Sequence, residues 1–176
     1  STCKIKQGQK KIIEAGSKIS SVAFSPDGTQ LLSGGADGAV RRWDAQTGRQ
    51  IGEAILRHQP DEQFGGVTSV AFEEKGTQIV SGGGDGTIRL WGVQGKATNH
   101  QWNSFPVTSV AISDGGNWVV SGGWDGMVRV WSAKTFGDDY EFPDRTRGGV
   151  SSVAFNREGT QVVSGNWDGT VRLWGV

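Results

Sequence analysis

Serine and aspartate recur together four times along the chain, always four residues apart, and both residue types serve in hydrolytic catalysis. The serines are Ser33, Ser81, Ser121 and Ser164, and the aspartates are Asp37, Asp85, Asp125 and Asp168. A serine nucleophile requires a base at its side, whereas the only histidines, His58 and His100, lie in irregular connections away from the pairs. Because an active site is seldom repeated four times in one chain, we expect a structural role for both sets and no catalytic residue.

The composition argues against several other classes of function. The 18 basic residues balance the 18 acidic ones, so no net field attracts nucleic acid or an anionic membrane surface. Cys3 is the only cysteine, which excludes an internal disulfide and a multi-cysteine zinc site and suits a cytoplasmic protein. The glycine-rich stretch 82–86 lacks the lysine and the following helix of a phosphate cradle. We therefore expect no cofactor, no metal, and no nucleic-acid or membrane partner.

Four copies of one unit organise the chain. The copies align over residues 22–43, 70–91, 110–131 and 153–174, and each ends in a tryptophan: Trp43, Trp91, Trp131 or Trp174. Successive tryptophans are 48, 40 and 43 positions apart, a period typical of stacked or radial repeat architectures. The 29 glycines among 176 residues, against an average of roughly 7%, indicate many turns and little helix.

Each copy reads as a short antiparallel meander. In the first copy, short apolar runs at 21–24, 31–33 and 40–43 alternate with glycine-containing turns, which predicts three strands. The more polar connections 49–56, 96–103 and 138–143 are expected to supply an outer edge strand to the first three copies. The sequence thus predicts one all-β domain over 1–176, with repeats at 19–56, 67–103, 107–143 and 150–176, the last one joined by residues 10–15.

The chain resembles the WD-repeat β-propeller family over nearly its whole length. The resemblance rests on SVAFSPDG at 21–28, LLSGG at 31–35 and VRRWD at 40–44, repeated at blade period. It implies four-stranded blades in which the turn aspartate joins a hydrogen-bond network with the serine, the tryptophan and a histidine. The serine and tryptophan positions match, but the histidine positions hold Ala15, Gln63, Asn103 and Thr146. We therefore expect this network to be truncated in every blade.

Propellers contain roughly 4 to 8 blades, and members of the WD-repeat family usually lie in the upper part of that range. Four blades are therefore few for a closed ring. The last copy stops at Val176 without an outer strand, and residues 10–15 are expected to supply it. One chain could close as a four-bladed ring, or two chains could join head to tail into eight blades with twofold symmetry. We favour the homodimer. A third alternative is a piece of a larger WD-repeat signalling protein, since residues 51–59 resemble connections in the sensor regions of large bacterial signalling ATPases.

Two tryptophans precede the turn aspartates of the last two copies, where the first two copies carry Ala36 and Gly84. This variation indicates that the residue at this position does not contribute to packing within the blade. By resemblance, Trp124 and Trp167 lie on a loop rim that many propellers use to bind peptides or proteins, with Lys18, Ser20, Thr68, Thr108 and Ser151 beside them. We expect a non-enzymatic interaction scaffold or sensor module. The alternatives are a glycan-binding propeller and indoles that merely pack over the central channel or against each other.

Overall fold

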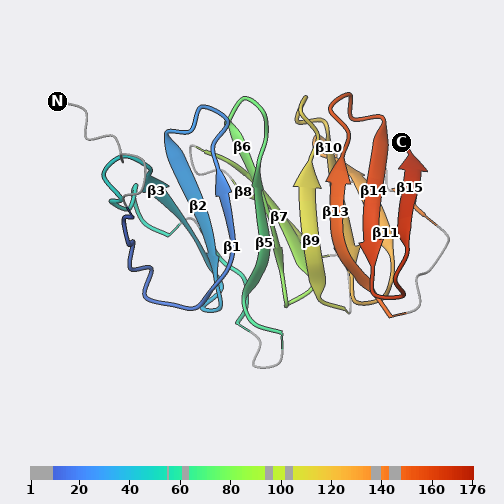
Figure 1. Ribbon diagram of the computed structural model, residues 1–176, viewed down its shortest axis with the longest axis horizontal. Coiled ribbons are helices and arrows are strands. Elements are labelled where there is room, and N and C mark those ends of the chain that lie inside the picture. Colours follow the sequence, from blue (N-terminus) through green and yellow to red (C-terminus); the bar gives the residue numbers. More distant parts are fainter. Residues whose placement is uncertain are drawn as a thin grey trace.

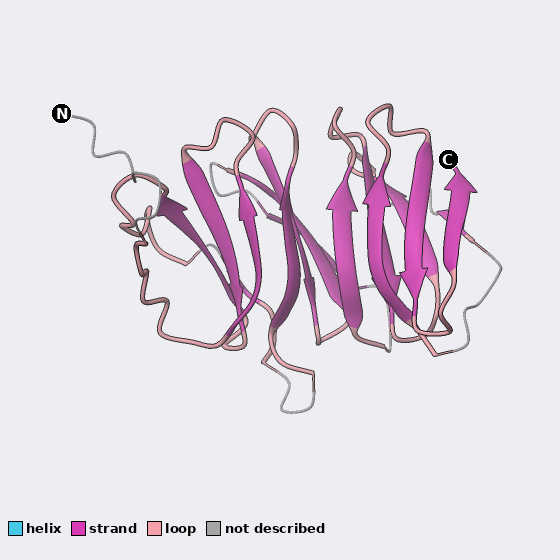
Figure 2. Ribbon diagram, in the orientation of Figure 1, coloured by secondary structure: helices cyan, strands magenta, loops and turns pink. Residues whose placement is uncertain are grey.

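Four antiparallel sheets follow one another along the chain in the computed structural model, which describes residues 10–54, 56–60, 64–93, 97–101, 105–135, 140–142 and 148–176 (Figures 1 and 2). The first sheet contains β1 (Ile19–Phe24), β2 (Gln30–Gly35), β3 (Ala39–Asp44) and β4 (Leu56–Arg57). The second contains β5 (Val67–Phe72), β6 (Gln78–Gly83), β7 (Thr87–Gly92) and β8 (Ala97–Gln101). The third contains β9 (Val107–Ile112), β10 (Trp118–Gly123), β11 (Val128–Ser132) and β12 (Tyr140–Glu141). The fourth contains only β13 (Val150–Phe155), β14 (Gln161–Asn166) and β15 (Val171–Gly175).

Tight turns reverse the chain between neighbouring strands of each sheet. In the first sheet, Gly28 and Gly38 adopt φ values of 70° and 79°, a backbone conformation that glycine reaches without steric cost. The side chain of Asp27 accepts hydrogen bonds from the backbone and the hydroxyl of Thr29, which fixes the β1–β2 turn. The three strands predicted for the first copy are therefore present, with one or two further residues at most of their ends, whereas the outer strand β4 overlaps the predicted connection 49–56 only at residue 56.

A β-bulge marks the start of every innermost strand. Residue pairing skips one position in β1, β5, β9 and β13, and the skipped residues are Ser20, Thr68, Thr108 and Ser151. Each of their hydroxyl groups donates a hydrogen bond to a glycine carbonyl on the neighbouring strand, at 2.9 to 3.0 Å. A bulge leaves one residue outside the ladder, so the hydroxyl restores a contact that the backbone loses there.

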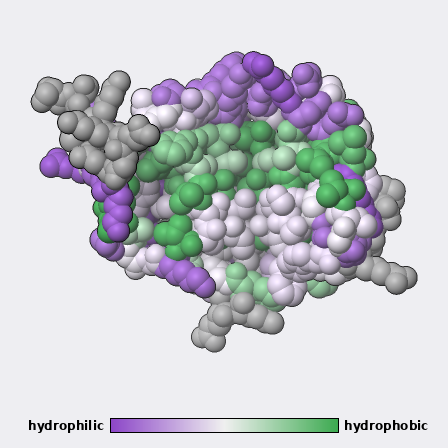
Figure 3. Space-filling model, in the orientation of Figure 1, coloured by the Kyte–Doolittle hydropathy of each residue, from purple (hydrophilic) through white to green (hydrophobic). Residues whose placement is uncertain are grey.

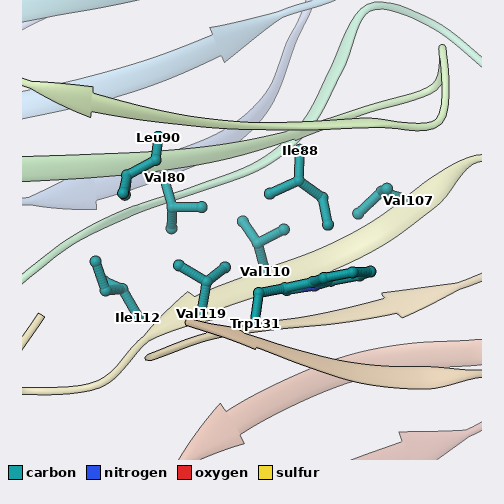
Figure 4. Close-up of a cluster of buried hydrophobic side chains, with 8 residues drawn as sticks. All are labelled: Val80, Ile88, Leu90, Val107, Val110, Ile112, Val119 and Trp131. Atoms are coloured by element: carbon teal, nitrogen blue, oxygen red, sulfur yellow. The ribbon is translucent and has the colours of Figure 1, made fainter. Parts of the chain in front are cut away.

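The hydrophobic core consists of three clusters, each between two consecutive sheets; we call such a contact a junction. Side chains of Leu32 and Val40 meet Val67, Val70, Ile79 and Trp91 in the first junction. Figure 4 shows the second, where Val80, Ile88 and Leu90 meet Val107, Val110, Ile112, Val119 and Trp131. In the third, Val120, Val128 and Val130 meet Val150, Val153 and Val162. The same repeat positions recur in each cluster, so one packing solution is used three times.

The row of sheets is open. Figure 1 shows the first sheet at one end and the fourth at the other, with β1, β5, β9 and β13 along a shared face. A hydrophobic band crosses the molecule in the same view (Figure 3). The described residues include no helix, and therefore none long and apolar enough to cross a membrane.

Residues 10–15 do not complete the fourth sheet of their own chain. Among the described residues that sheet has three strands, and residues 10–15 form no strand and lie beside the first sheet. The exchange of this segment between two chains stays a prediction. The amine of Lys11 donates a hydrogen bond to the carbonyl of Gln46 at 2.9 Å, and the side chain of Ile13 lines a hollow next to Trp43. Since the first and fourth sheets occupy opposite ends of the row, the N-terminal segment cannot reach β15 of its own chain in this arrangement.

Candidate functional site

In three of the four repeats, the serine bonds the tryptophan at the end of the same repeat. The indole N–H groups of Trp43, Trp131 and Trp174 donate to the hydroxyls of Ser33, Ser121 and Ser164 at 2.8, 3.2 and 3.2 Å. These serines are buried or nearly so. The repeated serines therefore anchor a core indole, as their position on the second strand of each sheet requires.

The second repeat departs from this pattern, and it corrects the sequence prediction. His58 follows β4 and its buried imidazole enters the second sheet, where Nε2 lies 2.8 Å from Ser81 Oγ and Nδ1 lies 3.1 Å from Asp85 Oδ1. The expectation that all four networks lack a histidine is thus wrong for this repeat. Trp91, whose counterparts bond serine, keeps a buried Nε1 without a hydrogen bond.

Ser81, His58 and Asp85 form the order of groups found in serine hydrolases. The geometry does not make them a catalytic site, because both Ser81 and His58 are 0% exposed and a nucleophile must reach its substrate. Burial raises the pKa of Asp85, but hydrogen bonds from His58 and Thr87 outweigh burial and hold that pKa well below the usual value of an aspartate. Ser81, His58 and Asp85, which we call the clasp, therefore form a buried hydrogen-bond network that links the first and second repeats.

Each turn aspartate also holds the arginine four residues later. The pairs are Asp37–Arg41, Asp85–Arg89, Asp125–Arg129 and Asp168–Arg172, with N···O distances of 2.5 to 3.7 Å. The hydrogen bond from Arg41 lowers the pKa of Asp37. Burial lowers the pKa of Arg129, but Asp125 and Glu141 more than compensate and raise it. These charges neutralise one another, which leaves them unsuited to holding a charged ligand.

Three aromatic side chains gather on the rim, which we define as the edge formed by the β2–β3, β6–β7, β10–β11 and β14–β15 turns. Trp124 and Trp167 meet edge to face, with ring centroids 5.0 Å apart and ring planes at 89°. Phe64 also meets Trp124 edge to face, with ring centroids 4.9 Å apart and ring planes at 71°. Both indoles remain 48% exposed. The three rings, which we call the aromatic row, thus cross from the second repeat to the fourth and still face solvent.

A hollow of about 370 Å³ opens along the aromatic row, lined by Phe64, Thr68, Pro106, Val107, Thr108, Trp124, Ser151 and Trp167. Five of the seven predicted rim residues therefore lie together, whereas Lys18 and Ser20 are exposed on the first repeat and do not line the hollow. None of the lining side chains is charged. Hydroxyl groups of Thr68, Thr108 and Ser151 already donate to backbone carbonyls in the bulges, so only their lone pairs can face a ligand.

Phe64 was not foreseen from the sequence, and it also explains the small residue of the second repeat. A Cβ added to Gly84 would lie 2.5 Å from the carbonyl oxygen of Gly65 and 2.9 Å from Phe64 Cβ. The prediction that the residue at this position does not affect packing within the blade is therefore wrong at Gly84, where no side chain larger than hydrogen fits.

The described residues hold no group of three or more histidine, cysteine or acidic side chains placed to bind a metal ion. The aromatic row is thus the candidate site that the described part of the chain supports.

Comparison with known proteins agrees with this architecture. The model of the family described as WD domain, G-beta repeat matches residues 8–44, 56–92, 95–132 and 140–175. The chain is also similar to the computationally designed Ika4 protein, known from a crystal structure, at 32% sequence identity and a TM-score of 0.73. That similarity covers 97% of this chain and 99% of the designed one. None of the curated proteins matches this chain.

Proposed function

Because the chain belongs to the WD40 repeat family, we propose that it is a non-enzymatic scaffold for protein or peptide interaction, which binds its partner on the rim at the aromatic row. The repeated polar residues support this proposal because they make structural contacts rather than form an active site. Serines accept hydrogen bonds from indole groups, and aspartates bind turn backbone and arginines. The half-exposed pair Trp124 and Trp167 carries the proposal, since large aromatic groups at solvent-facing hollows are the groups on which binding energy concentrates.

The partner that fits the hollow is a neutral, extended peptide segment with proline, aliphatic or aromatic side chains. An uncharged lining offers nothing to a phosphate or an acidic side chain, whereas perpendicular indoles present both a face and an edge to an apolar group. The bulge hydroxyls add acceptors for peptide N–H groups. A proline-rich segment suits such a site because its extended conformation is largely formed before binding.

The test is selection of peptides from a phage-displayed random library, followed by titration of tryptophan fluorescence with the selected peptides. The Trp124→Ala and Trp167→Ala variants should lose binding by about 10-fold or more each, because truncation of a hot-spot side chain costs about 2 kcal/mol. Glu74→Ala, an exposed residue in the β5–β6 turn at the end of the second sheet away from the rim, serves as control and should bind as the wild type. Selected peptides that bind all variants equally would refute the rim site.

A glycan is the second candidate, because exposed indoles next to hydroxyl groups suit stacking on a sugar ring. The bulge hydroxyls favour the peptide, since their donors are already used within the fold. A glycan array that yields specific ligands lost in Trp167→Ala would replace the peptide by a sugar.

We further propose that two chains assemble into one eight-bladed ring. The three-stranded fourth sheet and the open ends of the row support this assembly. A reducing compartment such as the cytoplasm is the proposed location, because Cys3 is the only cysteine. Should the chain be part of a larger signalling protein, the neighbouring blades of that protein would take the place of the second copy.

A further inference from the structure

The outer face of the fourth sheet repeats one half of a junction, and no other sheet of the described residues packs against it. Val171 is 78% exposed, whereas its counterparts Val40, Ile88 and Val128 are at most 2% exposed in the three junctions. Leu173 is 66% exposed, against 5% for Leu90. Burial of such side chains stabilises a fold, so leaving both in water forgoes stabilisation that the other repeats obtain.

The first sheet carries the complementary half at the opposite end of the row. Val22 is 71% exposed, whereas Val70, Val110 and Val153 are 5 to 6% exposed at the same repeat position. A hollow of about 280 Å³ lies on this face, lined by Ile13, Ala15, Ile19, Val22, Phe24, Leu31, Leu32, Ser33 and Trp43. Its largely apolar lining corresponds to the side chains that the second, third and fourth sheets present to the sheet before them.

A hydrogen bond across each junction supplies a second match. The hydroxyl of Ser21 accepts the backbone N–H of Val70 at 3.1 Å, and Ser69 and Ser109 accept those of Val110 and Val153 at 3.2 Å. Ser152 is the fourth member of this series and lies exposed on the fourth sheet. The backbone N–H at its complementary position belongs to Val22, at the far end of the same chain.

A glycine on each second strand supplies the third match. Cβ atoms added to Gly34, Gly82 and Gly122 would lie 2.4 to 2.6 Å from a valine Cγ1 of the next sheet, closer than real side chains approach. At Gly165 the nearest atom is the hydroxyl of Ser151, at 3.3 Å. The fourth glycine therefore keeps open the space that a valine fills in the other junctions.

We infer that a second copy of this chain occupies this face, with its first sheet docked on the fourth sheet of the first copy and the reverse contact made at the other end. Because the junction is heterologous, two copies must form it twice, which closes the ring through a twofold axis. Ser152 would accept the N–H of Val22 of the second copy, and Gly165 would face Ile19 of the second copy. This inference rests on the two-chain assembly proposed above but not on the rim site.

The N-terminal segment fits the same arrangement. β8 ends six residues before β9 begins, and residues 10–13 precede β1 by six to nine residues. Figure 1 shows this segment on the outer side of the first sheet, away from the second sheet. Within the described residues no strand pairs with the outer edge of β15, and an unpaired edge is a template for another strand. In the ring, residues 10–13 would complete the fourth sheet of the second copy as β4, β8 and β12 complete theirs.

The oligomeric state of the full chain tests the inference, by light scattering coupled to gel filtration at micromolar concentration. We expect twice the 18.7 kDa mass of one chain for the wild type and a melting temperature that rises with protein concentration. Leu173→Lys and Gly165→Val should each give the mass of one folded chain, with association weakened about 100-fold or more, since the first buries an unpaired charge and the second fills the docking space. Phe105→Lys, an equally apolar exposed position on the rim side, should keep the double mass.

A mixing experiment tests the head-to-tail order itself. Positions equivalent to 22 and 173 share a cluster in the second and third junctions. Val22→Glu and Leu173→Lys chains should therefore each remain single, whereas an equal mixture should give the double mass, with one unaltered junction and one that pairs Glu with Lys. A wild type that stays single at 100 µM, or variants that all keep the double mass, would overturn the inference. Trp124→Ala with the double mass but without peptide binding would locate a defect in the rim alone.

Discussion

The imidazole of His58 reaches the carboxylate of Asp85 across the first junction, with Nδ1 3.1 Å from Oδ1, although the two residues belong to different repeats. The carboxylate also accepts the backbone N–H of Gln59 at 2.8 Å and the hydroxyl of Thr87 at 2.7 Å. The connection between the first and second sheets is therefore fixed to the turn that follows β6. Among the described residues, the other two junctions have no histidine in this place.

His58→Ala should lower the free energy of unfolding by about 1 to 3 kcal/mol, because it leaves the buried groups of Ser81 and Asp85 without their shared partner. Urea denaturation followed by circular dichroism measures the change. Gln59→Ala is the matched control, since its contact with Asp85 uses the backbone N–H and survives the substitution. A loss below 0.5 kcal/mol for His58→Ala, on the scale of an ordinary surface substitution, would contradict the role of the clasp.

Asp85 should make the protein sensitive to acid. Its pKa in the folded state lies below the unfolded value of about 3.9, so the unfolded chain binds the proton first. The stability that this carboxylate contributes is thus fully present above about pH 5 and is lost progressively as the pH falls towards 2. Unfolding free energies measured across this range should fall less steeply for Asp85→Asn than for the wild type. Parallel profiles would show that another carboxylate governs the response.

The aromatic row should contribute a measurable coupling to stability. Edge-to-face contact between Trp124 and Trp167 predicts an interaction energy of about 0.5 to 1.5 kcal/mol in a double-mutant cycle built from the two single alanine variants and the double variant. Each single variant should stay folded, because the first repeat carries Ala36 at the same position. A coupling near zero would mean that the two rings touch without stabilising each other, which leaves binding as their role.

The repeated glycines should differ in their tolerance of a methyl group. Gly82→Ala should destabilise the fold by about 1 to 3 kcal/mol, since the added Cβ would lie 2.6 Å from Val107 Cγ1. Gly165→Ala should change the stability of a single chain by no more than about 0.5 kcal/mol. Both substitutions are best compared by denaturation in the Leu173→Lys background, where the chain stays single. Equal losses at the two positions would show that space around Gly165 is already filled.

Much of the fold follows from spacing. The repeat of serine, aspartate and tryptophan fixes three strands and two turns in each unit, and the structure has them at those places. His58 escaped prediction because the network histidine was sought at a fixed distance before the next sheet, at position 63, whereas His58 lies nine residues before Val67. A longer connection returns the same side chain to the same partner, and counting residues cannot detect this.

The rim was harder to foresee. Thr68 and Ser151 were expected to flank a ligand, but their hydroxyls serve the bulges, and nothing in a lone Ser or Thr distinguishes these two uses. Phe64 lies in a connection without repeat signal, so only the folded chain places it against Trp124. Turns within a repeat can therefore be predicted from short motifs, whereas contacts between repeats depend on how the sheets stack.

Every junction uses the same glycine, the same pair of valines and the same serine, so none of them records how many units the chain should have. Duplication or loss of a whole repeat would therefore add or remove one junction of the same kind and create no new type of interface. Tandem gene duplication thus needs no compensating mutations at the junctions, and the number of repeats can change until a number that closes the ring is favoured.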